Sequence, residues 1–310
     1  MQILQYLHRD RSVYVTYGAL YSYIWLLICR LLDATLADPT RLSGWLIPLE
    51  AAIFVLPLAV WLWLNRGRLT ASQLHLSRPS PRHIPLMLVS SVALVMGGLL
   101  LTILLSGSGI RADSFSLYHT FRARMGDGFF STVYLILGYA VLPAICEELF
   151  YRSLLCGELG RHGPLSAVLV SSLLFGMLHF ELQLLPLYVA AGAALSLVMY
   201  ATRSVFAAMI VHTAYNLFCI FAQPYVISFY INTASRPLFL MLSVTMFLLS
   251  AALTCLCCSR LYRQYAAEGL EPAYNVSLNK NQKLTSLGIL TISLPFILCA
   301  ITYLIAVIVF

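Results

Sequence analysis

Residues 84–105, with the sequence IPLMLVSSVALVMGGLLLTILL, form a stretch of 22 residues without a charged side chain. At about 1.5 Å of rise per residue, an α-helix of this length is about 33 Å long, while the hydrocarbon core of a bilayer is about 30 Å thick. The stretch therefore predicts a helix that crosses a membrane.

The composition of the chain extends this prediction to all 310 residues. Hydrophobic residues make up 60% and charged residues 10%, against about 45–50% and about 25% in a soluble domain. So few charges could not cover the core of a soluble fold, and a mean hydropathy of +0.85 excludes a disordered chain. The eight cysteines lie in or beside apolar segments and lack the spacing of a zinc finger. We predict an all-α, polytopic transmembrane helical bundle.

Hydropathy over a window of about 19 residues predicts about eight to nine membrane spans. The fifth and sixth are short and nearly contiguous, so we expect them to form a tight helical hairpin. The predicted segments are 13–32, 45–64, 84–105, 129–155, 164–180, 184–200, 204–225, 237–257 and 287–310. We divide the chain into N-terminal spans and connectors at 1–128, a central helical core at 129–225 and C-terminal spans at 226–310.

The net charge of +7 arises from 19 basic and 12 acidic residues. Lys and Arg accumulate in the cytoplasmic loops of membrane proteins. With the N-terminus in the cytoplasm, 12 basic residues fall in inner segments and five in outer loops. The sequence therefore predicts an integral membrane protein with a cytoplasmic N-terminus. It contains no basic run with interleaved aromatic residues, so its expected surroundings are the lipid bilayer and not a nucleic acid.

Ionisable residues inside membrane spans are energetically costly, and each is a candidate for function. The fourth span contains Pro143-Ala-Ile-Cys-Glu147-Glu148-Leu-Phe-Tyr-Arg152. Glu148 and Arg152 are four residues apart on one helical face, and a guanidinium can bind a carboxylate through a forked pair of hydrogen bonds. Adjacent helical residues diverge by about 100°, so Glu147 points elsewhere and has no nearby cation in the sequence. This pattern makes Glu147 the candidate general base.

The fifth and seventh spans contribute the remaining polar groups. Phe175 precedes His179 by one helical turn and could hold the imidazole by packing, so that His179 shares a water with Glu147. His212 and Asn216 project from one face of the seventh span and offer two donors for a developing oxyanion. Hydropathy places His179 near the outer end of its span, offset by up to about 10 Å from Glu147 and His212, and tilted helices or a fifth span that starts later than residue 164 would remove this offset.

Three further ionisable residues, Arg30, Asp33 and Glu50, stand alone or near the ends of their spans. Long side chains at such positions reach the membrane interface, so we expect these three to have structural roles.

The motifs Glu-Glu-x-x-x-Arg, Phe-x-x-x-His and His-x-x-x-Asn, in this order, resemble those of the type II CAAX prenyl endopeptidase and bacteriocin-processing family of intramembrane proteases, the CPBP or Abi proteins. The resemblance covers about residues 129–220, and every motif position is present. It implies that the central core is catalytic, that Glu147 activates water with His179 as its partner, and that His212 and Asn216 form the oxyanion site. The supporting residues would be Glu148, Arg152 and Phe175.

The family has been described both as metal-dependent and as glutamate-dependent. Zinc held by Glu147, His179 and His212 is therefore an alternative, because zinc favours three or four nitrogen or oxygen ligands. We favour chemistry without a metal cofactor. Asn216 is a poor zinc ligand, Arg152 adds positive charge near the site, and the His-Glu-x-x-His helix of zinc peptidases is absent.

The resemblance predicts an intramembrane endopeptidase of the bacterial plasma membrane. Its substrate would be a hydrophobic, membrane-anchored or prenylated peptide. The alternative is a non-catalytic membrane scaffold, immunity or carrier protein that retains the fold, in which the same polar residues serve as an ion pathway or a structural cluster.

Overall fold

The computed structural model describes residues 11–35, 46–66, 73–107, 129–270 and 280–310. Within these ranges the chain is built from helices, and its one pairing of extended backbone is an isolated antiparallel bridge between Leu76 and Ser204. The prediction of an all-α bundle is confirmed for this part of the chain.

The N-terminal third contains three candidate membrane spans, each of which includes a 3-10 or π-helical turn. Pro85 lies in the first turn of α5, where the missing N–H of proline costs no helical hydrogen bond. The elements are a 3-10 turn at Arg11–Val15, α2 (Thr16–Thr35), α3 (Leu46–Glu50), a π-helical turn at Ala51–Val55, α4 (Leu56–Leu64), a 3-10 turn at Pro81–His83 and α5 (Ile84–Ser106).

The central third begins with one long continuous helix that contains two π-helical segments. It consists of α7 (Phe129–Ile136), a π turn at Leu137–Val141, α8 (Leu142–Glu147), a π segment at Glu148–Leu155 and α9 (Cys156–Leu159), followed by a 3-10 turn at Gly160–His162. The predicted hairpin follows as α10 (Pro164–Met177) and α11 (Leu185–Thr202), and α12 (Val205–Phe221) completes this region.

The C-terminal helices are α13 (Gln223–Asn232), α14 (Arg236–Ala267), α15 (Lys280–Ile292) and α16 (Leu294–Val309). Helix α14 ends ten residues beyond the predicted boundary at residue 257. Its last turns carry the exposed Arg260 and Arg263, so the helix continues after its apolar segment has ended. Hydropathy detects the apolar segment and not the end of the helix.

Six helices among the described residues are long and apolar enough to cross a membrane, and two bent pairs raise the number to eight. The bent pairs are α12 with α13, at 51°, and the apolar part of α15 with α16, at 61°. Helix α10, with 14 residues, is shorter than a span. At about 1.5 Å per residue it is about 21 Å long, against about 30 Å of hydrocarbon. Helix α10 alone is therefore too short to cross the hydrocarbon core.

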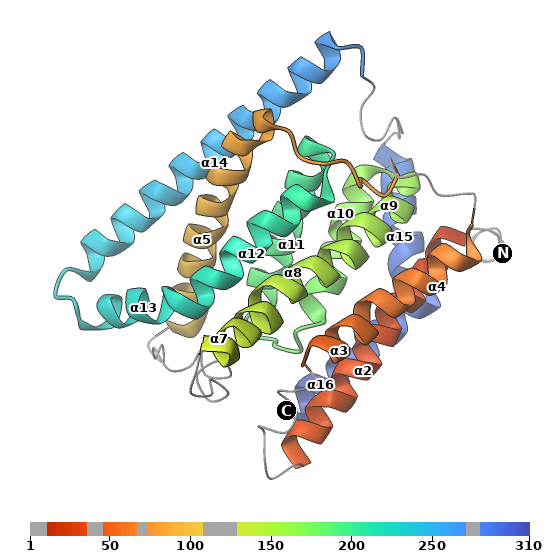
Figure 1. The fold of residues 1–310 in the computed structure, drawn as a ribbon, viewed down its shortest axis with the longest axis horizontal. Coiled ribbons are helices and arrows are strands. Elements are labelled where there is room, and N and C mark those ends of the chain that lie inside the picture. The colour runs from red at the N-terminus through yellow and green to blue at the C-terminus, as the bar shows by residue number, and fades with distance from the viewer. Residues whose placement is uncertain (1–10, 36–45, 67–72, 108–128, 271–279) are drawn as a thin grey trace.

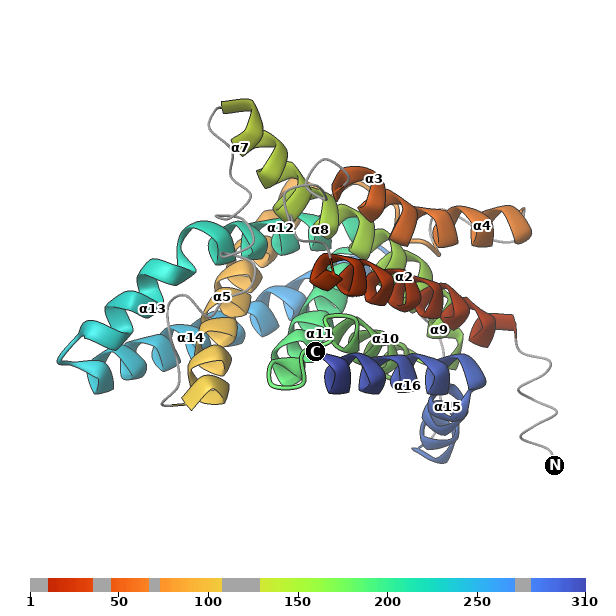
Figure 2. The same cartoon turned by 90° about the horizontal axis from the view of Figure 1, so that it is seen from below.

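The helices are arranged in three groups (Figures 1 and 2). Helix α5 packs along α14 at one side of the molecule, with α13 beside them. Helices α2, α3, α4, α15 and α16 lie at the opposite side, where α2 packs on α16. The long helix α7–α9 and helices α10, α11 and α12 lie between these two groups. The candidate residues of the fourth, fifth and seventh predicted spans all belong to this central group.

A connector segment fixes the beginning of α12. The backbone N–H of Val205 donates to the His75 carbonyl at 2.9 Å, and the Ser204 hydroxyl donates to the Ser77 carbonyl at 2.6 Å. The Ser77 hydroxyl donates in turn to the Arg203 carbonyl. These bonds set the starting position of the helix that carries His212 and Asn216.

Candidate active site

Prolines explain two of the three π segments. Pro143 follows the π turn Leu137–Val141, and Pro57 follows the π turn Ala51–Val55. A proline inside a helix lacks one N–H and its ring clashes with the carbonyl four residues earlier, which a wider turn relieves. The third segment, Glu148–Leu155, contains the Glu148–Arg152 motif. Such π segments recur at functional sites because they re-aim side chains.

Glu148 lies at the centre of a buried ionic cluster. Its Oε1 is 3.1 Å from Nη1 of Arg152 and is hydrogen-bonded to Nδ1 of His212 at 2.9 Å. The side chains of Glu148 and Arg152 are 0% and 1% exposed, so both charges are fully removed from solvent. The predicted pairing of Glu148 with Arg152 is confirmed. The ion pair runs through a single nitrogen and a single oxygen, so the expected forked geometry was wrong.

The forked geometry is absent because Glu148 has a second partner. His212 approaches the same carboxylate oxygen from α12, while Arg152 turns its guanidinium over the ring of Phe175 at 4.1 Å. Oε2 of Glu148 and Nη2 of Arg152 have no hydrogen-bond partner among the described residues. The sequence did not predict the contact between Glu148 and His212, which are 64 residues apart.

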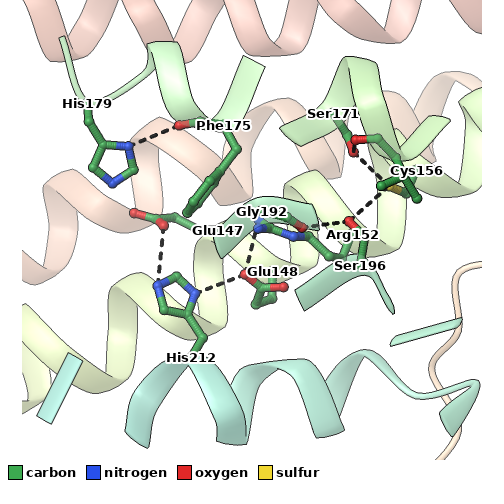
Figure 3. A network of polar contacts seen from close by, with 11 residues as sticks. Glu147, Glu148, Arg152, Cys156, Ser171, Phe175, His179, Gly192, Ser196 and His212 are labelled. Atoms are coloured by element: carbon green, nitrogen blue, oxygen red, sulfur yellow. Dashed lines mark hydrogen bonds and ion pairs between the residues drawn. The ribbon is translucent and has the colours of Figure 1, made fainter. Parts of the chain in front are cut away.

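Glu147 points away from this ion pair and toward the two histidines (Figure 3). Its Oε2 lies 4.0 Å from Nε2 of His212, which is an ion-pair distance and too long for a direct hydrogen bond. His212 therefore lies between the two glutamates, with Nδ1 on Glu148 and Nε2 facing Glu147. The divergence of adjacent helical side chains thus gives the two glutamates different contacts.

His179 lies in the turn that follows α10, and its ring is held on two sides. Nδ1 donates to the Phe175 carbonyl at 3.0 Å, and the ring stacks on Tyr188 of α11 with centroids 3.8 Å apart and planes 13° apart. A carbonyl only accepts hydrogen bonds, so Nδ1 carries the hydrogen, and in the neutral ring Nε2 is an acceptor. This nitrogen is available to a water molecule.

Phe175 connects the parts of the site. Its ring centroid lies 5.1 Å from that of His179 and 5.9 Å from that of His212, both in edge-on geometry, and Arg152 stacks on its face. Both histidines thus contact one buried ring. The offset of up to about 10 Å that hydropathy allowed does not separate His179 from His212, because both rings contact Phe175.

Asn216 is the candidate that the structure places apart. Its Nδ2 donates to the Ala140 carbonyl at 3.3 Å, within the π turn that precedes Pro143. Residue 140 lies about two helical turns before Glu147 on the long helix. Asn216 and His212 share one face of α12, as the spacing predicted, but the described contact of the amide is with the backbone of the facing helix.

Two residues outside the motifs also approach the site. The side chain of Glu50 interacts electrostatically with Glu147, and its Oε2 is shielded from solvent without a hydrogen-bond partner in the described ranges. Arg30 donates from Nη2 to the His179 carbonyl at 2.8 Å. Each of these two side chains thus has a contact within the protein, although both residues are partly exposed. The side chain of Asp33 lies outside what the structure describes. Tyr188 was missed because an isolated tyrosine in an apolar span gives no signal.

A metal ion at this site would need three or four ligands from these side chains. Among the described residues, no group of three or more His, Cys, Asp or Glu side chains has an arrangement that could hold one. His179 directs Nδ1 to a backbone carbonyl, and His212 directs Nδ1 to Glu148. Of the nitrogens of these two rings, only the Nε2 atoms face Glu147. In the zinc alternative, the ion would have to bind Glu147 and both Nε2 atoms.

The fold and this buried site define an integral membrane protein with a cluster of acidic and basic groups at its centre. Residues 129–218 match the family described as "Type II CAAX prenyl endopeptidase Rce1-like". This match confirms the resemblance drawn from the three motifs and supports peptide hydrolysis as the general class of activity. No curated protein and no solved structure is a significant match to the chain.

Proposed function

We propose that the protein is an intramembrane endopeptidase in which Glu147 and His179 activate the attacking water. One observation carries the proposal. Glu147, His179 and His212, from three different helical segments, gather around Phe175 within the matched residues 129–218.

In the proposed reaction, a water between Glu147 and Nε2 of His179 attacks the scissile carbonyl carbon. Glu147 takes the proton of the water while the carbonyl π bond opens to an oxyanion. The C–N bond then breaks, and the same proton passes to the leaving nitrogen, so that the reaction yields a carboxylic acid and an amine, which become carboxylate and ammonium when the acid gives up its proton. Tyr188 and the Phe175 carbonyl hold His179 in the orientation that presents Nε2.

His212 is the proposed oxyanion donor, with Glu148 as the group that orients it. The bond between Nδ1 and Glu148 fixes the ring so that Nε2 faces Glu147 and the reacting carbonyl. A hydrogen on Nε2 would then stabilise the oxyanion, and the Glu148 carboxylate would stabilise the ring when both nitrogens carry hydrogen. Asn216 would add a second donor after its amide moves from the Ala140 carbonyl to the substrate.

A hydrophobic, membrane-anchored or prenylated peptide is the proposed substrate class, since the site lies within a bundle whose outer helices expose many large apolar side chains. We further propose a bacterial plasma membrane location with the N-terminus in the cytoplasm. The reaction as written requires no metal, because the base and the donors are supplied by side chains.

The test uses purified protein in liposomes with two synthetic peptides that differ only in a prenyl group on a cysteine near the C-terminus. Mass spectrometry identifies the products, and cleavage in ¹⁸O-labelled water places one label in the new carboxylate if water attacks the carbonyl. Glu147→Gln should abolish cleavage without loss of thermal stability. The control is Glu158→Gln, on the same helix, where Glu158 pairs with Arg161 at 3.4 Å and not with a histidine.

The alternative is a non-catalytic scaffold, immunity or carrier protein. It predicts the opposite result for Glu147→Gln. The closed contact of Glu148 with Arg152 and His212 would also suit a purely structural cluster. In that case no peptide would be cleaved, and Glu147→Gln would retain the cellular function of the wild-type protein. Flux of a solute into liposomes would identify a carrier.

A further inference from the structure

Helix α2 lies outside the matched segment but contacts the turn that carries His179. Arg30, in the last part of this span, donates from Nη2 to the His179 carbonyl at 2.8 Å, although the two residues are 149 positions apart. An arginine within a membrane span is costly and calls for a partner inside the protein. Here the partner is the backbone of a proposed catalytic residue.

The residue after His179 gives Arg30 a second point of contact. Phe180 has a φ of +53°, in the left-handed region that aromatic residues rarely adopt. Its ring is buried, lies 5.6 Å from the Arg30 guanidinium carbon and meets Tyr23 edge-on at 5.8 Å. The unusual backbone conformation is thus held by two side chains of α2.

Tyr23 extends the same contact to the end of α10. Its hydroxyl donates to the Leu174 carbonyl. This carbonyl also accepts from the backbone N–H of Leu178 at 3.1 Å, so Tyr23 is its second donor at the end of α10. A positive charge near the end of a helix is favourable. Tyr23 and Arg30, two helical turns apart on α2, therefore hold the chain on both sides of the turn that contains His179.

We propose that Arg30 is a positioning residue for His179, supported by Tyr23 and Phe180, so that α2 forms part of the catalytic unit. This inference rests on the proposed function of His179. It goes beyond that function, because it assigns a role to α2, a helix that carries none of the three motifs. Without Arg30, the turn relaxes and the imidazole leaves the orientation in which Nε2 faces the water.

The first measurement compares Arg30→Ala with Arg236→Ala in the full-length protein. Arg236 is a matched control, because it also donates from Nη2 to a backbone carbonyl, that of Ile231, and lies over an aromatic ring, that of Tyr230, but at the turn between α13 and α14. Arg30→Ala should lower kcat about tenfold or more with KM within about twofold, as expected for loss of a charged hydrogen bond that acts on the chemical step. Arg236→Ala should leave both constants unchanged.

Arg30→Lys keeps the inference testable if Arg30→Ala folds poorly, and chemical rescue adds a second test if Arg30→Ala folds. Arg30→Lys retains the charge and one donor and should give an intermediate kcat, and added ethylguanidinium at non-denaturing concentration should restore part of the kcat of Arg30→Ala. A folded Arg30 variant with the wild-type kcat overturns the proposal.

Hydrogen exchange provides a reading that does not depend on catalysis. The backbone N–H groups of His179 and Phe180 donate to the carbonyls of Gly176 and Met177. In Arg30→Ala, a peptide that covers residues 178–184 should exchange faster than in the wild type, and in Arg236→Ala it should not. Unchanged exchange in Arg30→Ala overturns the proposal. If the wild-type protein cleaves no peptide, the proposed function fails, while this exchange difference still decides whether Arg30 holds the turn.

Discussion

The central helices and the α5–α14 pair place polar side chains in a membrane in two different ways. In the pair, hydroxyl groups donate to carbonyls of their own helix, as Ser90 does to Leu86 and Thr254 to Ser250. In the central group, hydroxyl groups such as that of Ser196 do the same, but His212 and Asn216 bind groups on the facing helix, Glu148 and the Ala140 carbonyl. A self-satisfied hydroxyl tolerates movement of its neighbours, whereas the central contacts exist only while the helices keep their positions.

This difference indicates where function is located. The α5 sequence contains no charged residue, and the charges of α14 lie at its two ends. Glu147, Glu148 and Arg152 lie on the long central helix, within one candidate span. A membrane protein keeps buried charges where they carry out chemistry or hold a site together. Breaking the central contacts should therefore affect stability and turnover, and changes in the α5–α14 pair should affect neither strongly.

The largest effect is expected from Arg152→Ala. The substitution leaves Glu148, which is fully buried, without its cation, and stranding one member of a buried pair costs about 3–5 kcal/mol. We expect a large fall in folding yield and in thermal stability, together with loss of cleavage. Arg263→Ala, at an exposed position of α14, is the control and should change neither. An Arg152→Ala protein with normal yield and melting temperature would contradict the structural role assigned to the ion pair.

The next largest effect is expected on turnover, in the variants His212→Ala and Asn216→Ala. Loss of one oxyanion donor typically lowers kcat by about 10²–10³. Steady-state kinetics should show a reduced kcat with little change in KM, because the lost bond forms in the transition state. His212→Ala should also lower stability, since it removes the hydrogen bond to Glu148, whereas Asn216→Ala should not. A reduced affinity with an unchanged kcat would assign Asn216 to substrate binding.

The contrast between local and distant contacts also explains what the sequence could predict. The pairing of Glu148 with Arg152 followed from their spacing within one helix, and the helices themselves followed from hydropathy. The contact between His212 and Glu148 depends on how two helices pack, which no periodicity encodes. The same holds for Arg30 and His179, which belong to different parts of the chain.

The π segments were missed, although part of their signal was present. Pro143 and Pro57 interrupt otherwise helical spans, and a proline there forces a local change in the hydrogen-bond pattern. The end of the fifth helix, close to His179, was misplaced for a related reason. The apolar run to residue 180 was interpreted as helix throughout, whereas α10 ends at Met177 and a turn follows.

Acid should loosen the link between the connector before α5 and the start of α12. Burial, and then the charge of Arg203, lower the pKa of His75 to about 4 from its usual value near 6.5. The unfolded chain therefore binds a proton between these values that the folded chain does not. The stability contributed by neutral His75 is complete above about pH 6.5 and is lost as the pH falls toward 4, by about 3 kcal/mol in total.

Thermal melting at a series of pH values checks this expectation. His75→Asn is the matched variant, because asparagine tolerates the left-handed backbone that His75 adopts at φ +51°. The variant should melt with a weaker dependence on pH between 6.5 and 4. An identical pH dependence in both proteins would remove His75 as the source of acid sensitivity.

A smaller effect on stability is expected from replacing glycine by alanine, and it should differ between Gly192 and Gly97. A Cβ at Gly192 of α11 would lie 3.0 Å from the Cα of Ser172, on the backbone of α10, which cannot move without separating the hairpin. A Cβ at Gly97 of α5 would lie 2.9 Å from the ring of Phe247, a half-buried side chain that can turn toward lipid. Gly192→Ala should cost about 1–3 kcal/mol of stability and reduce turnover through the His179 turn.

For Gly97→Ala, the gain in helix propensity of about 1 kcal/mol offsets the adjustment of Phe247. Its melting temperature and its kcat should stay close to those of the wild type. Equal losses in the two variants would show that the α5–α14 pair is as intolerant as the central hairpin, against the comparison drawn above.

The smallest effect is expected from removal of metal ions. If the central side chains supply the base and the oxyanion donors themselves, dialysis against a strong chelator should leave kcat unchanged, and metal analysis should find less than one equivalent per chain. The physical reason lies in the charge of Arg152, which lies beside the Glu148 carboxylate that binds His212 and disfavours a second cation there. A divalent cation would need Nε2 of both rings together with Glu147, and would therefore shorten the present 4.0 Å separation between Nε2 of His212 and that carboxylate. Loss of activity on chelation, with recovery on addition of zinc, would convert these three residues from base and donors into ligands, while leaving the site where the structure places it.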